Sequence, residues 1–109
     1  MADVLGAFEQ AVLLAIVRLR EAAYGRAILK EVQARLERDV PAGAVHATLE
    51  RLENKGLVAS RLGSGTPVRS GRARRFYRLQ PGVLRALNAA REALDTMWHG
   101  LKWPRKGTA

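Results

Sequence analysis

The sequence predicts a mainly α-helical domain with a small antiparallel β-hairpin and a long last helix, and three observations support this fold class. Apolar residues recur at three- and four-residue steps through the first 56 residues, which is the spacing of helices that bury one face. Apolar and polar residues then alternate on both sides of a glycine-rich loop between positions 57 and 79, as in paired strands. Helical spacing returns from position 83 to position 101. A chain of 109 residues is short enough to form one domain.

Two amphipathic helices are expected before residue 41. The first ends near Arg20, and its apolar stripe consists of Leu5, Phe8, Val12, Ile16 and Leu19. The second begins after Tyr24-Gly25 and ends before Pro41, because proline does not continue a helix. Its apolar stripe consists of Ile28, Val32 and Leu36.

A third helix is expected between Pro41 and Gly56, with proline at the start and glycine at the end as is usual for helices. At 100° per residue its core side carries Val45, Leu49 and Leu52. The opposite side carries Gly43, His46, Ala47, Glu50, Arg51 and Asn54, with Thr48 and Lys55 on the flanks.

The two strands are expected at Leu57 to Leu62 and at Ala73 to Leu79. In the second strand Arg75, Tyr77 and Leu79 alternate with Arg74, Phe76 and Arg78. The segment GSGTPVRSGR between the strands contains the glycines and proline of a loop. The sequence therefore predicts a β-hairpin with a long loop.

The last helix is expected to begin at Gln80-Pro81-Gly82, with Pro81 in its first turn. Its apolar positions include Leu84, Leu87, Ala90, Leu94, Met97, Trp98 and Leu101. Five of them follow steps of three and four residues in alternation, which is the spacing of a helix–helix seam. We expect this seam to be a dimer interface, or else to pack within its own domain. We divide the chain accordingly into a DNA-binding domain, 1–80, a dimerisation helix, 81–103, and a disordered tail, 104–109.

The positive charge is concentrated in the hairpin. The chain has 19 basic and 10 acidic residues. Residues 61–79 contain no acidic residue and six arginines, namely Arg61, Arg69, Arg72, Arg74, Arg75 and Arg78. Ordinary solvated surfaces mix both signs, so we interpret this segment as a binding surface for a polyanion. The alternative is a solvated arginine-rich loop.

Three helices followed by a basic hairpin form the order of a winged helix-turn-helix, in which the third helix enters the DNA major groove and the hairpin follows the phosphates. On this interpretation His46, Arg51 and Asn54 reach base edges. Small residues at the helix start allow close approach to the duplex, and the phosphate contacts come from Arg69, Arg72 and Arg74. Arg75 and Arg78 either share this role or are ordinary strand-surface residues. Alternatively, the outer side of the third helix is only the solvated face of an amphipathic helix and does not contact DNA.

Several function classes are excluded or disfavoured. The absence of cysteine excludes disulfides, thiolate nucleophiles and cysteine-ligated metals. His46 and His99 are the only histidines and have no acidic residue at a relay spacing, so we expect neither an enzyme nor a cofactor. The longest apolar run, Ala11 to Val17, is far shorter than the about 20 residues that span a bilayer. Asp3 and Glu9 disfavour a secretory signal, and we expect a cytoplasmic protein with no membrane partner.

Four segments of the sequence resemble the PadR family of bacterial and archaeal transcriptional regulators: LGAFEQAVLLAIVRL, AYGRAILKEV, PAGAVHATLERLENKGLV and GRARRFYRL. The resemblance implies a dimeric winged-helix repressor whose last helix exchanges contacts with the partner subunit. It places Tyr24 and Gly25 at the family's Tyr-Gly pair, Gly43, His46 and Thr48 in the recognition helix, and Arg72, Arg74 and Arg75 in the wing. A single helix after the hairpin corresponds to the family's short subclass.

The chain departs from the family at two places. His46 stands where the family commonly has tyrosine, and Gln80-Pro81 stands where it commonly has Thr-Pro. The first departure removes any contact that the tyrosine makes, and the second gives a weaker helix cap.

The expected function is that of a homodimeric repressor that binds a near-palindromic site in double-stranded DNA and responds to an effector. The expected DNA-binding residues are Tyr24, Gly43, His46, Ala47, Thr48, Arg51, Asn54, Arg69, Arg72, Arg74 and Arg75. Trp98 is either a platform for a flat aromatic effector or only an interface anchor. Two other functions stay open: a module that binds RNA or an acidic protein through its hairpin, and a DNA-coating protein without sequence preference.

Overall fold

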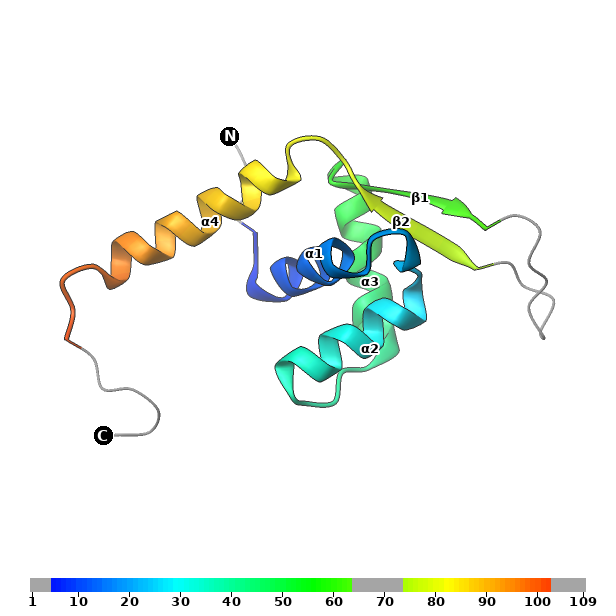
Figure 1. The fold of residues 1–109 in the computed structure, drawn as a ribbon, viewed down its shortest axis with the longest axis horizontal. Coiled ribbons are helices and arrows are strands. Elements are labelled where there is room, and N and C mark those ends of the chain that lie inside the picture. Colours follow the sequence, from blue (N-terminus) through cyan, green and yellow to red (C-terminus); the bar gives the residue numbers. More distant parts are fainter. Residues whose placement is uncertain (1–4, 64–73, 103–109) are drawn as a thin grey trace.

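The computed structural model describes residues 5–63 and 74–102. Figure 1 shows a body of packed helices, a hairpin that extends from it, and a last helix that runs away from the body. The elements are α1 (Ala7–Leu19), a short 3₁₀ helix η1 (Arg20–Ala22), α2 (Gly25–Leu36), α3 (Ala42–Asn54), β1 (Val58–Leu62), β2 (Arg75–Leu79) and α4 (Val83–Trp98). The predicted order of helices and strands is confirmed. Within these residues no helix has the length and apolar character needed to cross a membrane.

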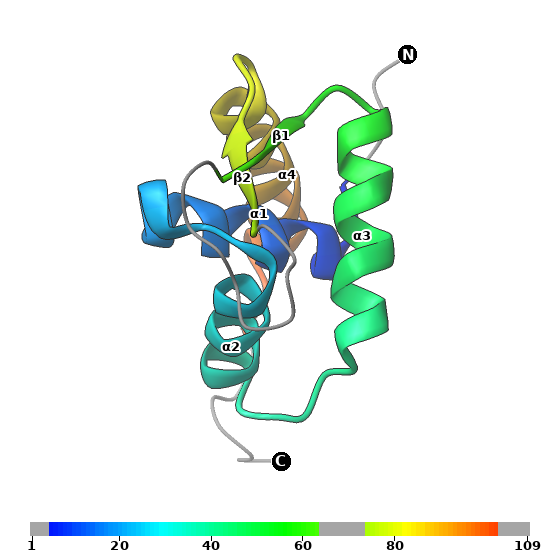
Figure 2. The same cartoon turned by 90° about the vertical axis from the view of Figure 1, so that its right-hand side faces the viewer.

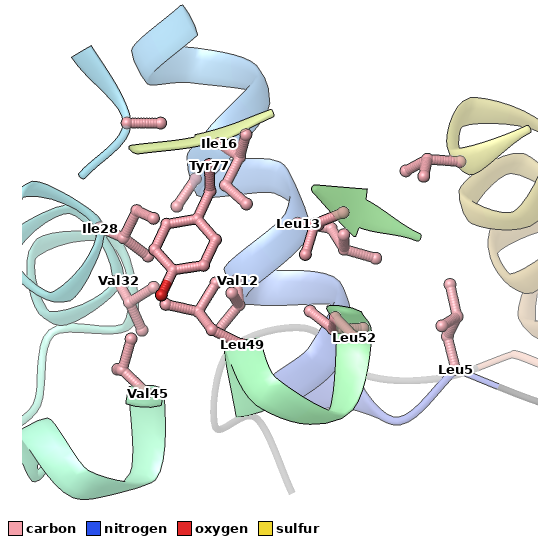
Figure 3. Close-up of a cluster of buried hydrophobic side chains, with 14 of the residues drawn as sticks. Leu5, Val12, Leu13, Ile16, Ile28, Val32, Val45, Leu49, Leu52 and Tyr77 are labelled. Carbon is pink, nitrogen blue, oxygen red and sulfur yellow. The ribbon is translucent and has the colours of Figure 1, made fainter. Parts of the chain in front are cut away.

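The core lies where α1, α2, α3 and the hairpin meet (Figure 3). Its largest fully buried side chains are Leu13, Ile28, Leu49 and Leu52, and burial of each such side chain contributes about 1.5–3 kcal/mol. The predicted stripes of the first and third helices are therefore confirmed as core faces. The prediction is wrong for Leu36, which is 39% exposed, because α2 ends at this residue and the chain turns at Glu37 with a φ of 54°.

The hairpin is antiparallel and pairs Val58 with Leu79 and Leu62 with Arg75. The first strand begins at Val58, one residue later than predicted. Ala73, the predicted start of the second strand, lies outside the described residues. Tyr77 is buried, so the predicted alternation in β2 correctly divides the core side of the strand from its outer side. The Tyr77 backbone N–H donates to the Ala23 carbonyl at 2.8 Å, which fastens the hairpin to the segment between α1 and α2.

The boundaries of α4 differ from the prediction at both ends. Gly82 has a φ of 95°, which is not helical, so α4 begins at Val83 and Pro81 lies before it instead of in its first turn. His99 has an extended ψ of 132° and ends the helix at Trp98. Leu101 therefore lies beyond α4, where its N–H donates to the Trp98 carbonyl at 3.1 Å. The tail at 104–109 lies outside the described residues.

Glu9 joins the start of α1 to the end of α3. Its Oε1 accepts from the Gly6 N–H at 3.0 Å and its Oε2 accepts from Lys55 Nζ at 2.9 Å, while Arg51 Nε lies 3.5 Å from the same Oε2. Burial by itself raises the pKa of Glu9, but the hydrogen bonds from Lys55 and Gly6 and the positive charges outweigh it. The pKa of Glu9 therefore lies below its ordinary value of 4.5.

We expect Glu9→Gln to destabilise the fold by about 2 kcal/mol at pH 7, because it removes the charge from a buried, hydrogen-bonded ion pair. Because folding lowers the pKa of Glu9, its ionised carboxylate stabilises the folded state fully above pH 4.5. This stabilisation is lost as the pH falls through the pKa that Glu9 has in the folded state. The difference between wild type and Glu9→Gln therefore shrinks as the pH falls below 4.5. Chemical denaturation across this pH range measures it.

Glu92→Gln is the matched control, since Glu92 is exposed and its side chain makes no ion pair within the described residues. It is expected to change the free energy of unfolding by less than about 0.5 kcal/mol. Equal effects of the two substitutions at pH 7 would contradict a stabilising role of Glu9.

Candidate nucleic-acid interface

The outer side of α3 is uncovered and has few long side chains. Figure 2 shows α3 at the edge of the molecule, beside the hairpin. Five of the residues predicted on this side are exposed and make no ion pair with a described residue, namely Gly43, His46, Ala47, Glu50 and Asn54. Two of the first three are small, so another molecule can approach the backbone at the start of the helix. This agrees with the predicted position of these five residues.

Thr48 does not lie where the sequence placed it, and Arg51 is exposed as expected but makes contacts that the sequence did not predict. Thr48 is only 2% exposed and belongs to the core side of α3. Arg51 Nη2 donates to Thr48 Oγ1 at 3.1 Å, and its Nε lies 3.5 Å from Glu9. The expectation that Thr48 lies on an exposed flank is wrong, and Arg51 is turned toward α1 because the buried carboxylate of Glu9 attracts it.

Two aromatic rings and two guanidinium groups pack together near the loop end of the hairpin strands. The Tyr24 and Phe76 rings meet edge to face, with centroids 5.7 Å apart. The guanidinium carbon of Arg74 lies 4.3 Å from the centroid of the Tyr24 ring, and that of Arg61 lies 5.2 Å from the centroid of Phe76. We call these four residues the arginine–aromatic cluster. It holds Arg74 against the start of α2.

Sequence reasoning found only half of this cluster. Tyr24 and Arg74 were predicted as site residues, whereas Arg61 and Phe76 were not assigned to the site. The strand register pairs Arg61 with Phe76, and Tyr24 forms an isolated bridge with Phe76. The hairpin register was the available signal, since residues directly opposite each other in two strands have adjacent side chains.

The described part of the hairpin is a cationic surface. Arg61, Arg74, Arg75 and Arg78 are exposed, and none of them forms an ion pair with another described residue. Arg75 Nη1 donates to Ser60 Oγ at 2.9 Å, which is a strand-surface contact of the kind left open above. The predicted residues Arg69 and Arg72 lie outside the described residues.

A shallow pocket of about 270 Å³ lies between the starts of α2 and α3. His46 and Arg26 are among its lining residues, together with apolar side chains and Tyr77. Arg26 is exposed and was not predicted as a site residue. In the described part of the chain, no three histidine or acidic side chains gather closely enough to hold a metal ion.

Much of α4 is apolar and uncovered. The side chains predicted as an interface seam divide into two groups. Leu87 is buried against the domain and Ala90 is half-buried. The others are 53–73% exposed, namely Leu84, Leu94, Met97, Trp98 and Leu101.

Comparison with known proteins identifies relatives of this architecture. The profile of the "Transcriptional regulator PadR-like family" matches residues 13–86. A PadR family transcriptional regulator from Eggerthella lenta is 30% identical, with 82% of this chain and 75% of that chain covered and a TM-score of 0.63. The complex structure of hsRosR-S1 is 26% identical, with 89% and 79% covered and a TM-score of 0.66. No protein of curated function matches significantly in sequence.

A further solved structure is similar in fold at lower identity. It is that of BpsR from Bordetella bronchiseptica, whose DNA binding is regulated by 6-hydroxynicotinic acid. It is 18% identical, covers 94% of this chain and 72% of that chain, and has a TM-score of 0.62.

We expect Gly63→Ala to destabilise the hairpin by about 1–3 kcal/mol. A Cβ at Gly63 would lie 2.7 Å from Cε1 of Phe76 and 3.3 Å from the Arg74 carbonyl oxygen. Relief of this clash must displace either the Phe76 ring or the strand backbone. Chemical denaturation measures the cost, and chemical shifts of the Phe76 and Tyr24 rings report the displacement.

Gly43→Ala is the control, because no atom lies within 4 Å of a Cβ at that position. This change is expected to be neutral or stabilising by up to about 1 kcal/mol, since alanine favours helix over glycine. An unchanged stability and unchanged ring shifts in Gly63→Ala would show that the cluster does not depend on this close contact.

Proposed function

The chain belongs to the PadR-like family of transcriptional regulators, and from that membership we propose that it is a cytoplasmic, homodimeric repressor released from DNA by a small-molecule effector. Members of this family are regulators and not enzymes. The observation that carries the proposal is the juxtaposition of two surfaces. The uncovered side of α3, with small residues at its start, lies beside a hairpin whose described arginines have no acidic partner among the described residues.

The proposed DNA contacts divide into base contacts and phosphate contacts. We assign base contacts to His46 and Asn54, because both are exposed on the outer side of α3; Asn54 suits adenine. Gly43 and Ala47 allow the duplex to approach the helix, whose first N–H groups favour a phosphate oxygen. Arg51 is at most a secondary contact, since it is already paired with Glu9.

The phosphate contacts are assigned to the hairpin. Arg74 is stacked on Tyr24, so its guanidinium is held in place before DNA binds, which reduces the entropy lost on binding. Arg69, Arg72 and Arg75 are proposed to continue this contact along the strand. Arginine suits phosphate because its planar fork donates two hydrogen bonds.

The proposed dimer is supported by two apolar surfaces. One is the uncovered seam of α4. The other is a groove of about 370 Å³ lined by Ala11 and Leu14 of α1, Leu36 of α2 and Leu94 of α4. Neighbouring apolar side chains left uncovered in the subunit are typical of an interaction site. In a two-fold dimer both third helices present the same face, and half-sites about 34 Å apart fit two successive major grooves.

The proposed effector is a flat aromatic molecule at Trp98. This residue is half exposed on α4, so a two-fold axis near it would bring two indole rings together. Regulation of BpsR by 6-hydroxynicotinic acid supports the expectation that proteins of this fold respond to small aromatic molecules.

We expect the triple change of Arg72, Arg74 and Arg75 to Gln to weaken operator binding at least about 100-fold and to reduce the salt dependence of binding, because each lost phosphate contact lowers the salt slope by about 1. The operator is first selected from random duplexes at physiological salt. Fluorescence anisotropy then measures affinity between low and physiological salt. The matched control changes Lys30, Arg38 and Arg85 to Gln. It removes the same number of positive charges, but at positions outside the hairpin.

Other outcomes of this experiment would contradict the proposal. Equal loss of affinity in both triple variants would indicate a general charge effect. Selection that enriches no motif, with equal competition by random duplex, would indicate a DNA-coating protein. Binding of RNA or acidic protein, but not of duplex, would indicate the other alternative function.

We expect Leu94→Lys to convert the dimer into monomers by raising the dimer dissociation constant at least about 100-fold, since it places a charge in the centre of the proposed seam. Leu94 is 56% exposed within the subunit, so the fold itself tolerates the change. Leu62→Lys is the control, because Leu62 is equally exposed at 56% but lies on the hairpin. Sedimentation equilibrium measures the dimer dissociation constant of both variants. An unchanged constant in Leu94→Lys would exclude this seam as the dimer interface.

A further inference from the structure

Two hydrogen bonds connect the end of α3 to both strands of the hairpin. Ser60 Oγ of β1 donates to Glu53 Oε2 of α3 at 2.9 Å, and Arg75 Nη1 of β2 donates to the same Ser60 Oγ at 2.9 Å. A hydroxyl has one hydrogen to donate and lone pairs that accept, so both bonds form at once. We propose that Glu53 and Ser60 are positioning residues, which hold the Arg75 guanidinium for contact with a DNA phosphate.

The strand register brings Arg75 to Ser60. Ser60 stands opposite Tyr77 in the hairpin, and Arg75 lies two positions before Tyr77 on β2, so all three side chains share one side of the sheet. Ser60 and Arg75 are thus diagonal neighbours, a separation that a long side chain spans. Because Tyr77 is buried on this side, Arg75 belongs to the side of the hairpin that packs against the core.

Arg74 and Arg75 are held by different contacts on opposite sides of the hairpin, since successive residues of a strand point to opposite sides. The Arg74 guanidinium stacks on the Tyr24 ring. The Arg75 guanidinium bonds to Ser60, and the Ser60 hydroxyl bonds in turn to Glu53. Both contacts reduce the side-chain freedom that an arginine loses when it binds DNA. Two neighbouring arginines are therefore ordered in advance by two separate devices.

The charge of Glu53 makes the inference testable by its sign. A carboxylate beside DNA repels the phosphates, so loss of an acidic residue from this end of α3 should strengthen binding if charge alone counts. Glu53 forms no ion pair with a described residue, and it accepts the Ser60 hydroxyl hydrogen. That bond turns the lone pairs of Ser60 Oγ toward Arg75. A positioning role thus predicts that loss of Glu53 weakens binding.

This inference rests on the proposed DNA contact of the hairpin, but its first step is measurable in the free protein. NMR relaxation of the Nε–Hε groups reports the mobility of each arginine side chain. We expect Arg75 to be more rigid than Arg78, which is exposed on the same strand and forms no ion pair with a described residue. Ser60→Ala and Glu53→Ala should each make Arg75 as mobile as Arg78. Ser60→Thr and Glu53→Gln, which keep a hydroxyl and an acceptor, should preserve its rigidity.

Fluorescence anisotropy with the selected operator tests the consequence for DNA binding. Ser60→Ala and Glu53→Ala should each weaken binding about three- to tenfold, because Arg75 must then be ordered when DNA binds. Ser60→Thr should stay within about twofold of the wild type, and Glu53→Gln should bind at least as tightly. Glu50→Ala is the matched control, since it removes an exposed carboxylate one turn earlier on α3. It should also bind at least as tightly as the wild type.

A double change separates positioning from a general effect on the hairpin. When Arg75 is already changed to Gln, Ser60→Ala should alter the affinity by less than about twofold, because the side chain that Ser60 holds is gone. The proposal is overturned by a full further loss in this background, by an Arg75 as mobile as Arg78 in the wild type, or by a Glu53→Ala variant that binds as tightly as Glu50→Ala. If Arg75 is rigid and both alanine changes release it, but no duplex is selected, the proposed function fails while the two hydrogen bonds stand.

Discussion

The position of the hairpin depends on Tyr77, and the candidate interface depends on the hairpin. The ring of Tyr77 lies among Ile28, Val32 and Leu49 (Figure 3), so it fixes one strand against both helices of the helix-turn-helix. Its backbone N–H bond to the Ala23 carbonyl adds a second point of attachment. Because side chains alternate along a strand, burial of Tyr77 turns its neighbour Phe76 outward to meet Tyr24. The stacking of Arg74 at the start of α2 is thus a consequence of one buried ring.

A second constraint decides which side chains α3 presents. Glu9 is buried and needs positive partners, and it takes them from the last turns of α3. Arg51 and Lys55 are thereby drawn toward α1, although Arg51 remains 55% exposed. His46, Glu50 and Asn54 are further exposed polar side chains of α3. In the proposed complex with DNA, most of the positive charge would therefore come from the hairpin, and α3 would supply few base contacts.

The sequence was sufficient where a feature depends on local periodicity. The stripes of α1 and α3 and the alternation around Tyr77 report burial directly, because each follows from the geometry of one element. It was insufficient where a feature depends on residues far apart in the chain. The contacts of Arg51 were missed because Glu9, far earlier in the chain, was not expected to be buried. Arg61 and Phe76 meet only through the strand register. The C-terminal ends of α2 and α4, at Leu36 and Trp98, depend on backbone turns that the spacing of apolar residues does not reveal.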